Sequence, residues 1–579
     1  MRATNSQSAA VLKHVRSLCI NLHLGAALFL SATAAPPAAR ADDGAIKPST
    51  PSAIAHDEPR LVVLIVIDQL RGDYLERFDG EFCDDGFRRL TRHGAWFPQA
   101  FYSHGTTATG PGHACISTGA NPRVHGISSN RATVGECTSD PGFPIVGLED
   151  ARRAAEGGSA AHLRCATIGE TLKHSPGFGR YFSVGLKRRG AILLAGRVCD
   201  GCLWFDTPSG RFVTSRAYSP ALPGFVEQFN EKKPADRYFG RAWERLLPLD
   251  DYATCAPDDD ACEWDLDGMG RTFPHVLHGK KNKADASFYA ALLGSPYGNE
   301  LLLDLARRVI ESERLGRDGV CDLMSIALSA NDVVGHAYGP ESQEVLDMTI
   351  QTDRQLGSFF QFLDDAVGRG RYTVALTADH GVTPVAARSL RAGRAGGLQP
   401  EEEMRTRLNE GLRSEFPAAA KLSPVRLVDL PWVFLDLPAL AAAGIPATEV
   451  IHRCAALCRR EPGIEWAFTE DQLAVPLPPD ADEYLRMAWE AYSPDSAGEV
   501  YAGLRPYWHE TSNAANHGSF QEFDRHVPVA FHGAGIRVIR SARRVDPIDV
   551  APTLLKLLDV PPPPTMQGEP LDEALRSNP

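Results

Sequence analysis

Long apolar runs are missing from most of this sequence. Of its 579 residues, 43% are hydrophobic, which is ordinary for a globular protein and enough for a large core. No run of about 18 apolar residues follows the first 41 positions, so we expect no membrane-spanning helix. The sequence also has no internal repeat and no heptad pattern, which argues against solenoids and long coiled coils.

Positive charge is also in short supply. The chain has 60 Lys and Arg against 73 Asp and Glu, which gives a formal net charge of −13. An acidic surface repels phosphate backbones and anionic lipid, so we expect no nucleic-acid partner and no anionic membrane partner. Against this background, any local cluster of Lys and Arg stands out.

The first 41 residues resemble a secretory signal peptide. Arg2, Lys13 and Arg16 form a basic start, and an apolar centre covers residues 18–30. Small residues follow, and we expect cleavage after Ala41, although a site at Ala34 also fits. Cleavage after Ala41 would remove four basic residues and no acidic ones, which takes the net charge to −17. We therefore expect a periplasmic or secreted protein.

Twelve cysteines are present, eleven of them after the signal. In an oxidising compartment, close pairs are most simply disulfides. The candidate pairs are Cys199 with Cys202, Cys255 with Cys262, and Cys454 with Cys458. A redox centre or a zinc knuckle at Cys199 and Cys202 is the alternative, but neither a thioredoxin-like pattern nor a second Cys-x-x-Cys supports it. An odd number leaves at least one cysteine that stays free or pairs between chains, and we expect Cys115 to be a buried thiol.

Short, mostly apolar runs predict the fold. The run at residues 61–67 is unbroken, which is typical of a strand buried on both faces, as in a parallel sheet. The runs at 323–328 and 372–377 are also strand-like. An amphipathic helix at 346–367 joins the last two, which predicts a crossover unit. After a polar linker at 42–59, we expect one α/β domain over 60–579, a three-layer α/β/α arrangement with a mostly parallel central sheet. The irregular segments 199–299 and 386–507 are predicted to be insertions that cap the site.

Acidic and histidine residues follow these apolar runs. In open α/β sheets, binding sites form where the strands end. A pair spaced four apart after the second run would share one helix face. Mixed Asp and His sites are typical of catalytic zinc, and paired metals suit displacement at phosphorus. The candidate ligands, enough for two three-ligand sites, are Asp68, Asp332, His336, Asp379, His380 and His517.

A second set of residues is suited to holding an anion. Thr109 begins a predicted helix that runs to Thr118, and the N–H groups at a helix N-terminus attract phosphate. Asn130 lies in a turn-rich loop. Lys187 and Arg189 form a basic island after a strand-like run, and in extended backbone both would point to the same side.

Taken in order, these motifs resemble the alkaline phosphatase superfamily, and in particular its exported threonine-nucleophile enzymes of the phosphate-irrepressible type. The resemblance extends from about residue 61 to the end of the chain. It implies that one zinc ion, which activates Thr109, is held by Asp68, Asp379 and His380. It implies that a second zinc ion, which stabilises the leaving oxygen, is held by Asp332, His336 and His517. Thr109 itself would also contact metal.

The resemblance further implies a hydrolase of small phosphate monoesters that releases inorganic phosphate through a phosphothreonine. Asn130, Lys187 and Arg189 would bind the phosphoryl group, and the basic pair would favour its dianion. Nucleotide pyrophosphatases and phosphodiesterases of the same superfamily are the alternative, although they generally lack this pair. A non-catalytic secreted zinc-binding protein is a third hypothesis. Sulfatases and phosphoglycerate mutases are disfavoured by the threonine.

The predicted cofactors are two Zn²⁺ ions, with manganese and cobalt as alternatives that coordination geometry would decide. Calcium could bind the acidic run Asp258–Asp260, but EF-hand spacing is missing, so a solvated loop is favoured. We expect the protein to be a monomer.

Overall fold

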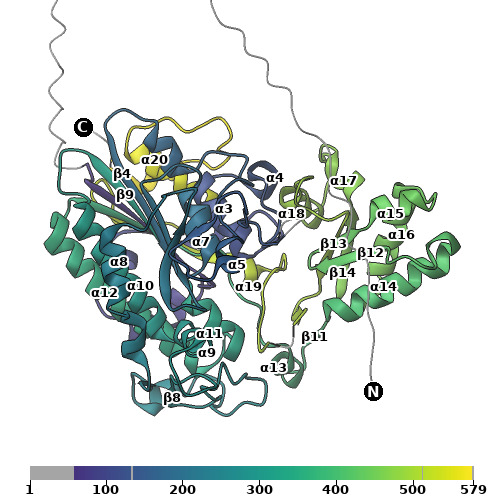
Figure 1. The fold of residues 1–579 in the computed structure, drawn as a ribbon, viewed down its shortest axis with the longest axis horizontal. Coiled ribbons are helices and arrows are strands. Elements are labelled where there is room, and N and C mark those ends of the chain that lie inside the picture. The colour runs from purple at the N-terminus through teal and green to yellow at the C-terminus, as the bar shows by residue number, and fades with distance from the viewer. Residues whose placement is uncertain (1–57, 132–134, 512, 577–579) are drawn as a thin grey trace, which may run out of the picture. The chain divides into compact units, whose positions relative to one another are not determined.

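The computed structural model describes residues 58–131, 135–511 and 513–576. The predicted signal peptide and most of the predicted linker lie outside the described residues. A ten-stranded main sheet organises the rest, in the order β18-β2-β17-β10-β1-β9-β4-β5-β6-β3 (Figure 1). None of the described helices is long and apolar enough to cross a membrane.

Five neighbouring strands at the centre of the main sheet are parallel. They are β10 (Tyr372–Thr377), β1 (Leu61–Ile67), β9 (Cys321–Leu328), β4 (Phe178–Gly185) and β5 (Gly201–Asp206). The predicted strand at 61–67 and the one at 372–377 are confirmed. The crossover from β9 to β10 passes over β1, which lies between them, through α12 (Gln343–Leu363).

Antiparallel strands complete both edges of the sheet. β17 (His526–Gly533) pairs with β10 and with β2 (Ala95–Phe101), which β18 (Ile539–Arg540) joins in parallel. At the other edge, β6 (Arg211–Ser215) pairs with β5 and with β3 (Ile145–Val146). The five central strands are therefore parallel, whereas both edges of the sheet contain antiparallel pairs.

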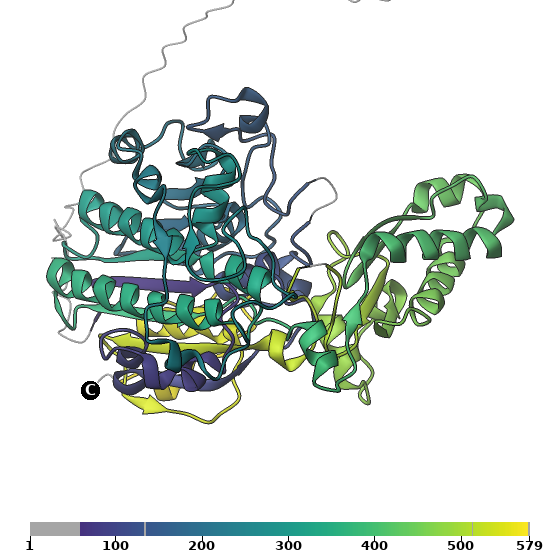
Figure 2. The same ribbon diagram turned by 90° about the horizontal axis from the view of Figure 1, so that it is seen from below.

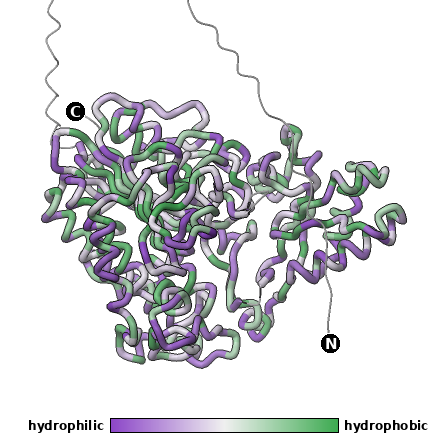
Figure 3. The backbone as a smooth tube through the Cα atoms, viewed as in Figure 1, coloured by the Kyte–Doolittle hydropathy of each residue, from purple (hydrophilic) through white to green (hydrophobic). Residues whose placement is uncertain are grey.

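The two faces of the sheet carry separate layers of helices. Odd-numbered residues of β1 pack with α10 (Pro296–Glu313) and α12, and even-numbered residues pack with α3 (Thr109–Thr118) and α20 (Val550–Leu557). Figure 1 shows α10 and α12 on one side of β4 and β9 and α3 and α20 on the other. Hydrophobic residues follow the central strands in Figure 3. The three-layer α/β/α prediction is confirmed.

The predicted insertion at 199–299 begins too early. β5 and β6 belong to the main sheet, so the chain leaves it only after Ser215. The turn-like residues Asp200 and Gly201 and the short hairpin between the two strands hide the periodicity of this region. The helices α8 (Gly224–Glu231) and α9 (Ala286–Leu293) then pack near α10.

The predicted insertion at 386–507 is a folded subdomain and not an irregular segment. Its sheet has the order β12-β13-β15-β14, and α14 (Glu401–Glu415) and α16 (Ala447–Cys458) pack on it around their own core, green in Figure 2. The strands are β12 (Val425–Asp429), β13 (Trp432–Leu435), β14 (Ile464–Thr469) and β15 (Val500–Leu504). At its base, β11 (Gly397–Leu398) pairs with β16 (Trp508–His509).

All eleven cysteines in the described part of the chain are free thiols, so the structure differs from the predicted disulfides. The Cys255 side chain packs against the main core and that of Cys262 against a different cluster, so these two point apart. Cys454 and Cys458 lie one turn apart on α16 and share a hydrogen bond. Cys115 is fully buried, as predicted.

Candidate active site

The metal-ligand candidates lie where the parallel strands end. Asp68 follows β1, and its backbone N–H donates to the Leu328 carbonyl at the end of β9 at 2.9 Å. Asp379 and His380 follow β10 in the same way. All three side chains are fully buried. Because the strands are parallel and in register, residues more than 300 positions apart meet at one edge.

The structure brings the candidates together in two groups that could each hold a metal ion. Asp68, Asp379 and His380 form one group, with ligand atoms within 4.8 Å of one another. Asp332 and His517 form the second group together with His380. The remaining candidate ligand, His336, has its Nε2 3.2 Å from Asp332 Oδ1, because α11 (Ala330–Tyr338) places the two residues one turn apart.

The three histidines are all oriented through Nδ1. This nitrogen lies 3.0 Å from the Ala515 carbonyl oxygen in His336, 2.9 Å from that of Gly381 in His380, and 2.8 Å from that of Thr107 in His517. Each ring therefore donates from Nδ1 and directs Nε2 into the site. A backbone carbonyl on one nitrogen and a free second nitrogen is the usual arrangement of metal-binding histidine.

Several buried polar atoms at this edge lack a hydrogen-bond partner among the described residues. They include Asp68 Oδ1, Thr109 Oγ1 and His380 Nε2. A buried polar atom without a partner costs about 1–3 kcal/mol. A cation would satisfy all three atoms, so the residues present fit a pair of metal ions.

The charges of the site are strongly coupled. Burial alone would raise the pKa of Asp379, but the charges of His380 and His113 lower it. Burial alone would lower the pKa of His380, but Asp379 and Asp68 raise it to about 9. The pKa of His517 is lowered to about 3 by burial and by the charge of His380. The Asp379 carboxylate thus stays ionised and attracts positive charge.

Thr109 is the first residue of α3 and is 1% exposed. The helix runs to Thr118, and Gly119 ends it with φ +62°, as the sequence predicted. His113, one turn on, has its Nδ1 2.9 Å from the Thr109 carbonyl oxygen and 3.1 Å from Asp379 Oδ2. The helix that carries Thr109 is therefore joined directly to the first group of metal-ligand candidates.

Lys187 lies between the two groups. Its Nζ is 2.8 Å from Asp68 Oδ2 and 2.5 Å from Asp332 Oδ2. Lys187 has extended backbone, with φ −99° and ψ 139°, but Arg189 does not, because α7 (Arg188–Ala195) begins shortly after β4 ends at Gly185. Lys187 caps this helix and Arg189 lies in its first turn. Arg189 pairs with Glu136 through Nη1, while its Nε has no hydrogen-bond partner in the described residues.

Asn130 faces the start of α3. Its Oδ1 accepts the Gly110 N–H at 2.7 Å, which fixes the orientation of the amide. The loop that carries Asn130 is held by the subdomain: Trp432 Nε1 donates to the Ser128 carbonyl at 2.9 Å, and Asp429 accepts from Ser129 Oγ. The subdomain thus contacts residues directly before Asn130.

Comparisons with known proteins place this chain in a family. The sequence matches the model of the type I phosphodiesterase / nucleotide pyrophosphatase family over residues 62–178 and 181–425. It is 30% identical over 573 residues to alkaline phosphatase PhoV of Synechococcus elongatus, covering 97% of this chain and 100% of that protein. It is also 30% identical over 533 residues to a protein of Myroides odoratus named calcium-transporting ATPase, covering 90% and 95%.

The structure matches that of wild-type alkaline phosphatase PafA with a TM-score of 0.80 and 28% identity, covering 90% of this chain and 99% of that one. The chain belongs to the alkaline phosphatase superfamily. Within it, the matches to PhoV and PafA place the chain in the phosphate-irrepressible type, and it is a phosphatase.

Sequence reasoning missed three residues of this phosphatase. Gln69, with φ +66°, donates from its backbone N–H to Asp379 Oδ1 at 3.1 Å and from Nε2 to Asp332 Oδ1 at 2.7 Å. His113 joins Thr109 to Asp379, and Glu136 holds Arg189. Only His113 carried a sequence signal, since it follows Gly110-Pro111-Gly112 in the first turn of α3.

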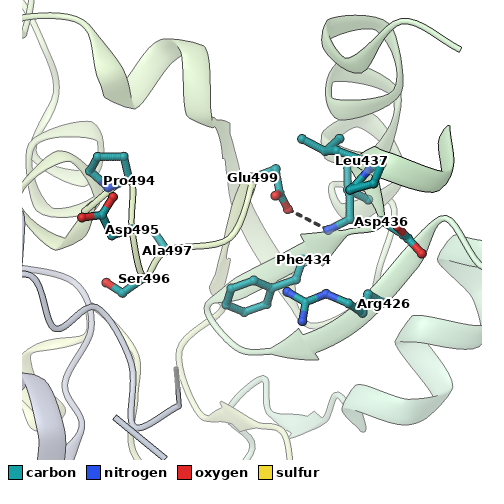
Figure 4. A pocket seen from close by; sticks show the side chains of 11 residues that line it. Arg426, Phe434, Asp436, Leu437, Pro494, Asp495, Ser496, Ala497 and Glu499 are labelled. Carbon is teal, nitrogen blue, oxygen red and sulfur yellow. Dashed lines mark hydrogen bonds between the residues drawn. The ribbon is translucent and has the colours of Figure 1, made fainter. Parts of the chain in front are cut away.

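The phosphatase also has a cavity of about 420 Å³ in which Arg426, Phe434 and Glu499 face residues of the loop 494–497 (Figure 4). Glu499 Oε2 accepts the Leu435 N–H at 2.6 Å. No metal-ligand candidate is among its lining residues. The loop matters to the site in another way, because Ser496 Oγ donates to the Gly126 carbonyl at 2.8 Å, near the start of the Asn130 loop.

Proposed function

We propose that this phosphatase hydrolyses small phosphate monoesters at a two-zinc site through a phosphothreonine formed at Thr109. The observation that carries the proposal is the buried Thr109 hydroxyl, which has no hydrogen-bond partner in the described chain and begins a helix joined through His113 to Asp379. A hydroxyl at a helix N-terminus, next to buried carboxylates that attract cations, is suited to attack an anionic phosphoryl group.

Six side chains would hold the two ions. Asp68, Asp379 and His380 would bind one, and Asp332, His336 and His517 would bind the other. When bound, the ions supply Lewis-acid charge at the attacking and leaving oxygens. Zinc is the metal that this set of oxygen and nitrogen ligands without cysteine favours.

Two displacements make up the reaction. Thr109 Oγ1 gives its proton to solvent and attacks phosphorus, and a phosphothreonine forms. The bond from phosphorus to the leaving oxygen breaks, and the leaving group departs with the bonding electron pair and takes up a proton from solvent. Water then attacks the same phosphorus, which releases inorganic phosphate and restores the hydroxyl. Each displacement inverts the configuration at phosphorus, so the complete reaction retains it.

Three further side chains would recognise the phosphoryl group. Asn130 would donate from its amide nitrogen, since its Oδ1 is already used by Gly110. Lys187 and Arg189 would contact the extra charged oxygen that a monoester has and a diester lacks, and the planar fork of Arg189 suits such an oxygen. We further propose that the phosphatase acts as a monomer in the periplasm or outside the cell, after removal of residues 1–41.

Thr109→Ala tests the proposal. We expect this variant to lose turnover of an aryl phosphate monoester while it keeps two zinc ions per chain and its melting temperature. Thr109→Ser, which keeps a hydroxyl, should retain measurable activity. Each protein is then mixed with substrate and quenched with acid. Mass spectrometry should find phosphate on the peptide that contains residue 109 in the wild type, and it can also find it in Thr109→Ser, but not in Thr109→Ala. Undiminished turnover by Thr109→Ala would remove Thr109 from the reaction.

A phosphodiesterase is the second candidate function, because the matching family model describes type I phosphodiesterases. The basic pair at Lys187 and Arg189 favours a dianion and therefore a monoester. A comparison of the two substrate classes separates these functions.

A further inference from the structure

Glu136 lies opposite the first turn of α7 and contacts both arginines there. Its Oε1 accepts from Arg189 Nη1, and its Oε2 accepts from Arg188 Nε at 2.9 Å. Burial alone would raise the pKa of Glu136, but Arg189 and Arg188 lower it, so the carboxylate stays charged. About a quarter of each side chain is exposed in the pair of Glu136 and Arg189, so solvent only partly screens it.

The same residue is tied to Asn130 through the backbone. Glu136 forms an antiparallel bridge with Arg131, and the N–H of the next residue, Cys137, donates to the Asn130 carbonyl at 2.9 Å. Glu136 therefore belongs to the same local structure as Asn130 but holds a side chain of α7. The two phosphoryl-binding candidates Asn130 and Arg189 are fixed to each other through Glu136.

The contact also decides which part of the Arg189 guanidinium is free. Glu136 occupies Nη1, whereas Nε is buried and has no hydrogen-bond partner in the part of the chain that the structure describes. Arginine loses considerable rotamer freedom when it binds an anion, and a partner that fixes the side chain beforehand reduces that loss. Lys187 is held differently, by Asp68 and Asp332.

We propose that Glu136 is a positioning residue that sets the preference of this phosphatase for monoesters by holding Arg189 in place to bind the phosphoryl dianion. The inference rests on the proposed function. A diester has an ester group where the extra charged oxygen of a monoester would be, so an Arg189 that is held in place benefits the monoester far more.

Glu136→Ala tests the inference in zinc-loaded enzyme, by kcat/KM for an aryl phosphate monoester and for the matching diester. We expect the monoester value to fall by about tenfold or more, the scale of one charge-assisted hydrogen bond, with much less change for the diester. In an Arg189→Ala background, Glu136→Ala should cause little further loss of monoester kcat/KM, because the effects of substitutions at two interacting residues are not additive. Glu136→Gln, which keeps one acceptor oxygen, should recover part of the loss.

Glu156→Ala is the matched control. Its carboxylate lies 3.9 Å from Arg188 and its side chain is 61% exposed, so its loss should leave both substrates unaffected. Equal losses of monoester and diester activity in Glu136→Ala would overturn the inference. So would an equally large effect of Glu136→Ala in the wild-type and in the Arg189→Ala background. A wild type without monoester turnover, or an Arg189→Ala variant without a monoester-specific loss, would instead contradict the proposed function.

Discussion

Gly112 is the residue at which α3 comes closest to the end of β10. A Cβ atom on this residue would lie 2.1 Å from the Asp379 carbonyl oxygen, which is backbone and cannot move aside. Gly110 is less restricted, since its Cβ would meet Cys137 Sγ at 3.1 Å. The glycine at 112 is thus what allows the helix of Thr109 to lie against the first group of metal-ligand candidates.

Gly112→Ala should therefore destabilise the protein and weaken metal binding together. Inserting a methyl group into a filled space costs about 1–3 kcal/mol, and here the strain falls on Asp379. We expect a lower melting temperature and a lower zinc content after dialysis. Gly224→Ala is the control, because no described atom lies within 4 Å of its added Cβ. Unchanged zinc content in Gly112→Ala would show that the approach of α3 does not matter to the site.

Single residues of the site could be predicted where they follow a strong local pattern. Asp68 and Asp379 come directly after apolar runs, so their place at the strand ends follows from the sequence. Gln69 could not be identified, because its role depends on a left-handed backbone and on Asp332, 263 positions away. Glu136 was missed for the same reason, since its partner Arg189 lies 53 positions further along the chain.

At the scale of elements, the subdomain holds the Asn130 loop at several points. β13 contributes the Trp432 N–H to Ser128, and β12 contributes Asp429 to Ser129 and, at 3.1 Å, to Arg131 Nε. Removing one hydrogen bond of this kind costs about 1 kcal/mol and leaves a buried carbonyl unpaired. The subdomain therefore acts on the site through the position of Asn130.

Trp432→Phe should lower monoester kcat/KM several-fold, because the N–H that holds the Ser128 carbonyl is lost. The fold should persist, because a buried aromatic ring remains at this position. Trp466→Phe is a suitable comparison. The buried Nε1 of Trp466 has no partner among the described residues, so that change removes no hydrogen bond. The monoester kcat/KM and the melting temperature are measured for both variants. Equal effects of the two substitutions would contradict a role for the subdomain in placing Asn130.

The elements themselves were predictable only where burial is uniform. β1 and β10 are buried along their whole length. β1 is an unbroken apolar run, and β10 is mostly apolar, with threonine at positions 373 and 377. β12 and β14 have mixed burial, so their sequences show neither an apolar run nor strict alternation. The helical position of Arg189 was not predicted, because nothing in the residues shows that α7 begins at Arg188, soon after β4.

At the scale of the whole molecule, an acidic protein places a few positively charged side chains at one edge of its main sheet. Lys187 lies beside the buried carboxylates of Asp68 and Asp332, which metal ions would neutralise, and Arg189 is held by Glu136. With the metal ions bound, the two cationic side chains would leave positive charge facing a substrate. Such an arrangement would reward the second charge of a phosphate monoester. The acidic surface elsewhere would not retain anionic products.

The ratio of kcat/KM for an aryl phosphate monoester to that for the matching diester, measured at pH 8 with zinc-loaded wild-type protein, tests the central claim most directly. We predict a large preference for the monoester that falls sharply when Lys187 and Arg189 are both replaced by alanine. A preference for the diester would contradict the account and assign the chain to phosphodiester hydrolysis.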